Sequence, residues 1–104
     1  MRKTVYLDSK AKKSLDKLPQ NVREEFYARF LILQLEGKLE MPYAKKINKQ
    51  LFEIRVKIDN IYRGFYAYTG INQVIILHIF NKKTQKTPLK EILLATKRLT
   101  AYEK

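Results

Sequence analysis

Residues 51–58 read Leu-Phe-Glu-Ile-Arg-Val-Lys-Ile, an unbroken alternation of apolar and charged side chains. A period of two is typical of a half-buried β-strand, because successive side chains of a strand point to opposite faces of the sheet. One face carries Phe52, Ile54, Val56 and Ile58, and the other carries Glu53, Arg55 and Lys57. The apolar row must pack on a core, so the sequence predicts a sheet whose opposite face bears fixed charges.

Two more strand-like segments follow this one, at residues 61–68 and 73–81. They are separated by the turn residues Asp59-Asn60 and Gly70-Ile71-Asn72. Short polar turns between strands favour antiparallel pairing of neighbours. The middle of the chain therefore predicts a three-stranded antiparallel meander.

The N-terminal part predicts a short strand and a helical hairpin. The strand covers residues 3–7, and Asp8 or Ser9 caps a first helix that ends at Pro19. The same proline opens a second helix that stops near Gly37. The inner stripe of this second helix is Val22, Phe26, Phe30 and Leu33, widened by Leu31, Ile32 and Leu35. So wide a stripe predicts a helix that is well covered.

A Lys-rich polar connector, residues 37–50, joins the hairpin to the meander, and Thr87-Pro88 begins a last helix. The predicted order is β-α-α-β-β-β-α. This is an α+β fold, with a small antiparallel sheet, a helical hairpin and a C-terminal helix, all helices lying on one sheet face. A chain of 104 residues predicts a single domain, 1–104.

The charge balance narrows the class of partner. The chain has 22 Lys and Arg against 10 Asp and Glu, a formal charge of +12. Such a balance favours nucleic acid, an acidic protein or an anionic membrane as partner. The longest aliphatic runs are far too short to span a bilayer, and the absence of Cys suits a reducing cytoplasm. We therefore predict a cytoplasmic protein without a membrane partner.

Several kinds of chemistry lack the residues they need. One His and no Cys exclude a zinc site with the usual ligands, the acids are scattered, and we predict neither metal nor cofactor. Three glycines give no phosphate-binding loop, and Ser9 and Ser14 have no plausible base nearby. His78 lies among apolar residues in the third strand-like segment, which predicts a packed core histidine rather than a base.

The turn at Asp59-Asn60 decides where Arg63 points. A two-residue turn would place Arg63 on the core side, where an unpaired guanidinium costs several kcal/mol. A three-residue loop instead pairs Lys57 with Arg63 and puts Phe65 on the same face. We predict the three-residue loop, which adds Arg63 to the charged row.

The next strand ends in Phe80-Asn81-Lys82-Lys83, which brings further cations to this face. A cationic, partly aromatic, open sheet face is the kind of surface that binds single-stranded RNA. The alternative is a solvated face on which Glu53 pairs with Arg55 or Lys57.

Four groups of residues resemble the HigB branch of the RelE/ParE toxin superfamily, including its phage-derived members. They are Phe-Glu-Ile-Arg-Val-Lys at 52–57, Tyr-Arg-Gly-Phe-Tyr at 62–66, His-Ile-Phe-Asn-Lys-Lys-Thr-Gln-Lys-Thr-Pro at 78–88, and Glu91, Ala95 and Arg98. The resemblance is close in the C-terminal half, and the N-terminal half agrees in layout only.

The resemblance implies a small toxin that cleaves messenger RNA in the ribosomal A site, contacts ribosomal RNA and is neutralised by a helix-turn-helix, HigA-like antitoxin. Cleavage in such enzymes uses no metal, and attack of the 2′-hydroxyl gives a 2′,3′-cyclic phosphate. By position, Arg55 and Lys57 match the basic pair of the first central strand, Arg63 matches the arginine of the next, and Lys82-Lys83 match the basic pair at the end of the last.

We therefore take as catalytic candidates Arg55, Arg63, Lys82, Lys83 and Glu53, and as RNA-binding candidates Lys57, Phe65, Lys45, Lys46 and Lys86. The cations would stabilise the phosphate, and Glu53 or a lysine crowded by other cations would act as base. The chain has Glu53 where RelE has a lysine, and it lacks a counterpart to the C-terminal tyrosine of RelE. These departures keep open a ParE-like gyrase inhibitor with the same fold and no catalysis.

Overall fold

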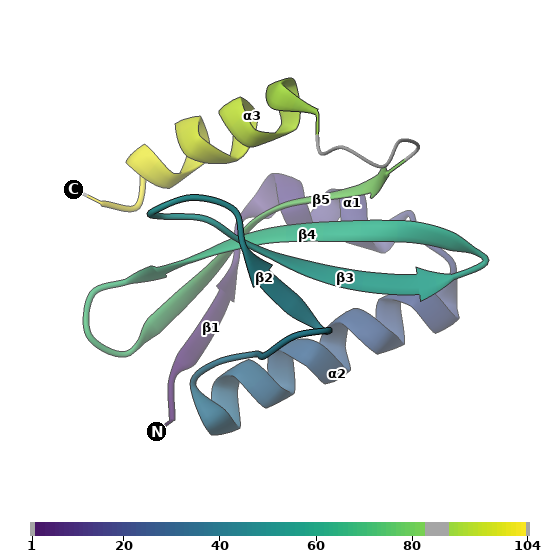
Figure 1. Cartoon of the computed structure of the whole chain (residues 1–104), viewed down its shortest axis with the longest axis horizontal. Coiled ribbons are helices and arrows are strands. Elements are labelled where there is room, and N and C mark those ends of the chain that lie inside the picture. Colours follow the sequence, from purple (N-terminus) through teal and green to yellow (C-terminus); the bar gives the residue numbers. More distant parts are fainter. Residues whose placement is uncertain (1, 83–87, 104) are drawn as a thin grey trace.

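The computed structural model describes residues 2–82 and 88–103, and of Lys82 it describes the strand position without the side chain. Lys83 and Lys86, both predicted to act at the site, lie outside the described residues. The elements in order are β1 (Thr4–Leu7), α1 (Ser9–Asp16), α2 (Gln20–Glu36), β2 (Ala44–Lys46), β3 (Phe52–Ile58), β4 (Asn60–Thr69), β5 (Gln73–Lys82) and α3 (Leu89–Thr100). Figure 1 shows the strands as one twisted sheet with helices around it.

The sheet has the order β1-β5-β4-β3-β2. Its centre is the predicted antiparallel meander of β3, β4 and β5. β1 joins β5 in parallel, so the sheet is mixed rather than wholly antiparallel. β2, which lies in the predicted connector, is a three-residue edge strand that reads Ala-Lys-Lys. So short and charged a segment gives no strand pattern, although lysines are common on sheet edges. The α+β class is confirmed.

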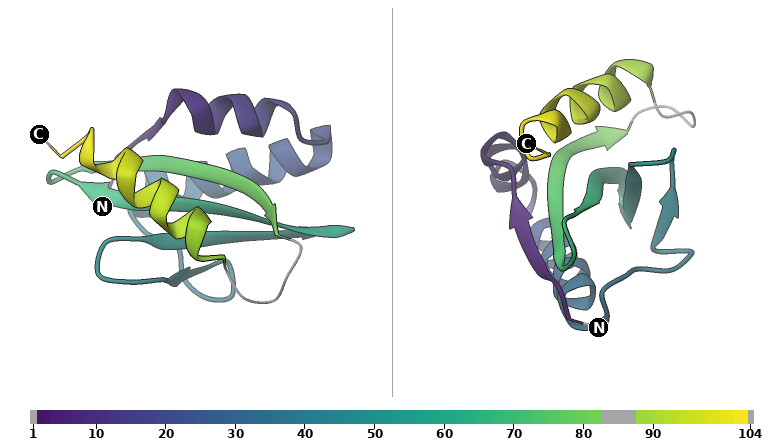
Figure 2. Two further views of the ribbon diagram at one scale, coloured as in Figure 1. Left: turned by 90° about the horizontal axis from the view of Figure 1, so that it is seen from above. Right: turned by 90° about the vertical axis from the view of Figure 1, so that its left-hand side faces the viewer.

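The helices lie on both faces of the sheet, so the prediction that they gather on one face is wrong. α1 and α2 lie on one side and α3 on the other (Figures 1 and 2). The core beneath α1 and α2 includes Leu15, Phe26, Phe30, Ile54, Val56, Tyr62 and Tyr66. The core beneath α3 is Leu51, Phe65, Ala67, Ile75, Leu77, Ala95 and Leu99. α3 covers only part of its face, and the charged row of β3 belongs to the remainder.

A β-bulge in β5 changes which side chains face α3. Phe65 pairs with His78, but the next residue of β4, Tyr66, pairs with Ile76, which leaves Leu77 as an extra residue. A bulge shifts the alternation of side chains by one position. Leu77 and His78 therefore both face α3 although they are consecutive.

The helix α2 keeps its predicted inner stripe, because Val22, Phe26, Phe30 and Leu33 are all buried. The prediction of a well-covered helix is wrong, since Leu31, Ile32 and Leu35 are 53%, 41% and 43% exposed. At 100° per residue these positions fall on the flank turned away from the sheet. In the described ranges, no helix combines the length and the apolar character needed to cross a membrane.

Candidate functional site

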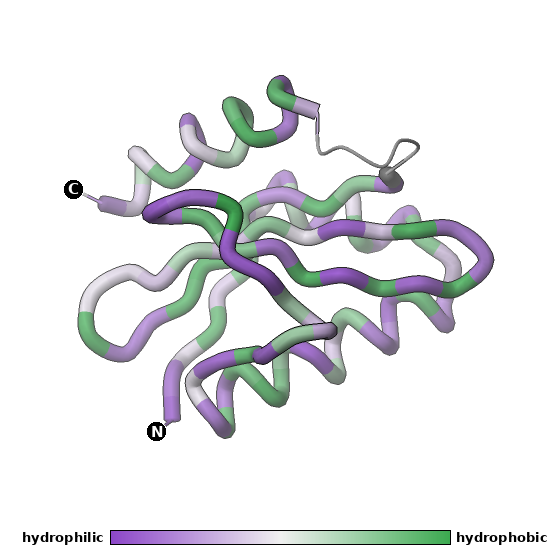
Figure 3. The backbone as a smooth tube through the Cα atoms, in the orientation of Figure 1, coloured by the Kyte–Doolittle hydropathy of each residue, from purple (hydrophilic) through white to green (hydrophobic). Residues whose placement is uncertain are grey.

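The β3–β4 hairpin places Arg63 directly opposite Arg55. Ile58 pairs with Asn60 across a single residue, Asp59, whose φ of 62° is a left-handed conformation that aspartate tolerates. The predicted loop paired Lys57 with Arg63, so the actual register differs from it by two residues. A shift of two keeps every side chain on its face. Arg63 therefore joins the charged row as predicted, with Arg55 as its cross-strand neighbour. The alternation of polar and apolar residues along β3 is visible in Figure 3.

A buried ion pair holds Arg63 in place. Its Nη1 donates to Glu53 Oε1 at 2.8 Å, and the two residues are only 4% and 1% exposed. Lys45 from β2 approaches the same carboxylate oxygen at 3.9 Å. Burial lowers the pKa of Arg63 most, the carboxylate of Glu53 opposes this, and the charge of Arg55 lowers the pKa further. A guanidinium nevertheless keeps its proton at neutral pH. The ion-pair partners of Glu53 thus include Arg63, a pairing that was not among those predicted.

A small pocket lies over this ion pair. It has a volume of about 80 Å³ and is lined by Met41, Pro42, Ala44, Lys45, Glu53, Arg55 and Arg63. The guanidinium Nε of Arg63 is buried and has no hydrogen-bond partner in the described part of the chain. Arg55 and Lys45 are exposed at the rim. Three cations against one carboxylate make this recess suited to an anion the size of a phosphate group.

The backbone around the pocket is tied to α2. The amide of Arg55 donates to the carbonyl of Tyr43 at 3.0 Å, and the carbonyl of Arg55 accepts from Arg29 Nη1 at 2.9 Å. The guanidinium of Arg29 also lies 4.6 Å from the centre of the Tyr43 ring, a cation–π contact. These contacts fix the connector that forms one wall of the pocket.

The other predicted residues are divided between the faces. Lys57 is exposed two positions beyond Arg55, on the same face. Lys46 is paired with Phe52 in the sheet, and its Nζ lies 6.0 Å from the centre of that ring, on the α2 side. Phe65 is 0% exposed and packs in the core beneath α3. Lys82 ends β5 opposite Ile61. The structure therefore brings together Arg55, Arg63, Glu53 and Lys45.

A second polar cluster, which was not predicted from the sequence, joins α3 to the sheet beside this site. His78 is buried as predicted, but its Nε2 lies 3.1 Å from Glu91 Oε1. Arg98 Nη1 donates to the carbonyl of Leu77 at 2.9 Å and lies 3.4 Å from His78 Nδ1. Since arginine only donates, Nδ1 accepts and Nε2–H donates to Glu91, which describes a neutral imidazole. Residues 74–80 are apolar apart from His78, so the sequence has no alternation there that could have pointed to this cluster.

This cluster predicts a loss of stability in acid. Burial lowers the pKa of His78 below its usual 6.5. Glu91 and Asp8 raise this pKa and Arg98 lowers it, but burial has the largest effect. As the pH falls, His78 is protonated in the unfolded chain before it is protonated in the folded one. The free energy of unfolding is therefore highest above about pH 6.5 and decreases as the pH drops below that value. Melting temperatures measured between pH 7.5 and 5 should fall less in His78→Gln, whose amide still donates to Glu91. Equal falls in both proteins would contradict the assignment.

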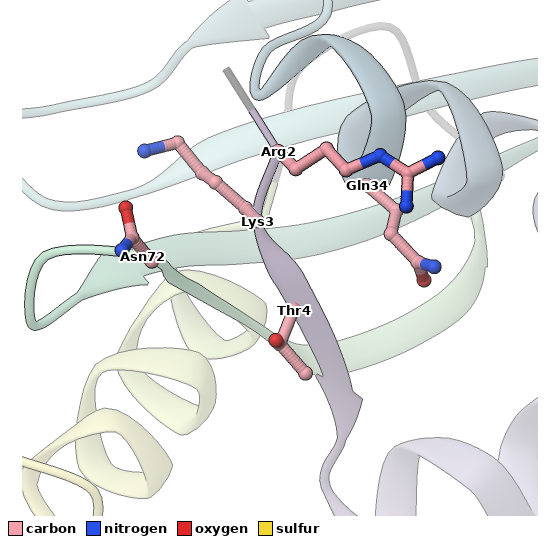
Figure 4. A pocket seen from close by; sticks show the side chains of 5 residues that line it. All are labelled: Arg2, Lys3, Thr4, Gln34 and Asn72. Carbon is pink, nitrogen blue, oxygen red and sulfur yellow. The ribbon is translucent and has the colours of Figure 1, made fainter.

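A larger pocket beside β1 is lined by two cations that do not converge. It has a volume of about 360 Å³ and is lined by Arg2, Lys3, Thr4, Gln34 and Asn72 (Figure 4). The side chains of Arg2 and Lys3 point away from each other there. We place the candidate site at the smaller pocket, because its cations converge. Among the described residues, no three His, Asp or Glu side chains form a cluster that could hold a metal ion.

Comparison with known proteins gives both a sequence family and a fold. The family model "Phage derived protein Gp49-like (DUF891)" matches residues 13–100, most of the chain. No curated protein matches in sequence. The free-state structure of an E. coli RelE toxin, carrying two arginine-to-alanine substitutions, superposes with a TM-score of 0.72 at 19% identity, covering 95% of this chain and 99% of that one. The RelBE2 toxin–antitoxin complex of Mycobacterium tuberculosis superposes with a TM-score of 0.62 at 22% identity, covering 79% of this chain and 100% of that one. At these identities the likeness shows the fold.

Proposed function

The chain belongs to the family of phage-derived Gp49-like proteins, and on this premise we propose that it is the toxin of a type II toxin–antitoxin system that cleaves messenger RNA on the ribosome. Within the RelE/ParE superfamily we place it in the HigB branch. The RelE fold and the basic residues of the central strands support this assignment. The observation that carries it is the convergence of Arg55, Arg63 and Lys45 on one recess of the open sheet face.

In the proposed reaction, the 2′-oxygen of a ribose attacks the adjacent phosphorus. The bond from phosphorus to the 5′-oxygen of the next nucleotide breaks, which yields a 2′,3′-cyclic phosphate and a 5′-hydroxyl. A base takes the 2′-hydroxyl proton, and an acid protonates the leaving 5′-oxygen. Negative charge increases on the phosphate oxygens in the transition state, where Arg55 and Arg63 would stabilise it.

The carboxylate and lysine candidates receive different roles. Glu53 is fully buried and bonded to Arg63, so we assign it the orientation of that guanidinium. Lys82 and Lys83, which follow in sequence at the end of β5, are our candidates for proton transfer. Lys57, exposed on the same face, would contact the RNA backbone beyond the scissile phosphate, as would Lys86.

The proposal includes a partner and a cellular location. A protein of this charge that damages messages must be silenced in its own cell, so we propose a HigA-like, helix-turn-helix antitoxin. The RelBE2 structure is itself a toxin–antitoxin complex, which supports such a partner. Ribosomal RNA and translated messages place the proposed activity in the cytoplasm.

Mapping of RNA ends tests the proposal. After a brief pulse of expression, we expect new messenger 5′ ends inside translated frames, and we expect them to vanish when translation is arrested first. Messages that stay intact while plasmid supercoiling changes would overturn the proposal in favour of a gyrase inhibitor. Copurification with the product of the neighbouring gene tests the antitoxin.

A further inference from the structure

An aromatic ring lies beside the cationic pocket on the same sheet face. Phe80 of β5 is the cross-strand partner of Arg63, so the two side chains are neighbours, with Cβ atoms about 5 Å apart. The ring is partly buried, packed against the core beneath α3. Phe65, by contrast, is wholly enclosed and offers no ring face to a ligand.

Two other rings pack against the Phe80 ring. His78 stacks on it with centroids 5.0 Å apart and an interplanar angle of 17°, and Phe65 meets it at 5.2 Å and 57°. His78 is in turn fixed by Glu91 and Arg98 of α3. A ring held in this way loses little freedom when a flat ligand stacks on it.

We propose that Phe80 is a nucleobase-stacking site for single-stranded RNA, taking the base of a nucleotide whose phosphate lies at Arg55 and Arg63. We choose single-stranded RNA as the ligand because an aromatic ring can stack on a base while the neighbouring cations bind its phosphate. Glu91 and His78 act as positioning residues that hold the platform flat. This inference rests on the proposed function, because it uses the phosphate site of that function.

The chain contains no tryptophan, which permits a direct test. Phe80→Trp introduces a single indole at the proposed platform, and stacking of a base should quench its fluorescence. Phe52→Trp is the matched control, because Phe52 is also a partly buried strand phenylalanine but lies on the α2 face. Titration with an uncleavable 2′-O-methyl oligonucleotide should quench the first indole and leave the second unchanged.

Affinity gives a second measurement that does not depend on the reporter. Stacking of one base on an aromatic ring predicts that Phe80→Leu weakens binding of the oligonucleotide by about five- to a hundredfold. Phe52→Leu should bind as the unaltered protein does. An oligonucleotide that lacks the stacked base should bind the unaltered protein more weakly by the same factor. Removal of that base should not weaken binding to Phe80→Leu any further.

The outcomes separate this inference from the function beneath it. If Phe80→Leu and Phe80→Trp bind without loss and without quenching while Arg55→Ala loses binding, the stacking site is wrong and the phosphate site stands. If Arg55→Ala also binds normally, the phosphate site fails as well. Equal quenching in Phe80→Trp and in Phe52→Trp would mean that RNA binds without a defined platform, which also overturns the inference.

Discussion

We expect Arg63→Ala to lower the free energy of unfolding by about 3–5 kcal/mol, a large part of the stability of a small domain. The substitution removes the guanidinium that lies 2.8 Å from a fully buried carboxylate. Lys45 approaches the same carboxylate from a half-exposed side chain at the longer distance of 3.9 Å. A buried charge that loses its short ion pair recovers less of its desolvation cost. Urea unfolding followed by circular dichroism measures the change.

The double variant Glu53→Leu/Arg63→Met is the control for this prediction. Replacing both members of a buried ion pair by apolar residues of similar volume is often neutral for stability. The double variant should therefore recover most of the lost stability, yet it should not cleave RNA, because the buried cation of the pocket is gone. An Arg63→Ala protein that unfolds at the same urea concentration as the unaltered chain would show that the ion pair contributes nothing.

Arg55→Ala should leave the fold intact and reduce cleavage by about two to three orders of magnitude. The side chain is exposed, and the hydrogen bonds that hold this position come from its backbone. One lost contact to a phosphate in the transition state costs about 2–4 kcal/mol. Single-turnover cleavage of messenger RNA on purified ribosomes measures the rate directly.

Lys46→Ala is the matched control for Arg55→Ala. It removes an exposed cation of the same charge, but one that lies over Phe52 on the opposite face. We expect its single-turnover rate to stay within a few-fold of the unaltered protein. Equal losses in the two variants would mean that total charge, rather than the pocket, governs the activity.

The alternation at residues 51–58 was sufficient to predict the strand β3 and the composition of its two faces. Period-two patterning is a local property, so it can be read without knowledge of the neighbours of the strand. The face of Arg63 was also predictable. A two-residue turn would have buried its charge unpaired on the core side, which costs too much free energy. The exact register between β3 and β4 was not predictable, since a shift of two residues leaves each side chain on the same face.

Local signals also predicted where the helices begin and end. Asp8 caps α1 through its side chain, and Gly37 ends α2 in the left-handed conformation. The net charge of +12 was fixed by composition alone and pointed to a phosphate-bearing partner.

Tertiary structure alone decided which of these charges meet. Glu53 pairs with Arg63 because two strands lie side by side, and Lys45 reaches them only because β2 adds to the edge. The bulge at Leu77 turns two consecutive residues, Leu77 and His78, toward the same face, beneath α3. A bulge depends on how two strands fit each other, and such non-local fits leave no periodic trace in either strand.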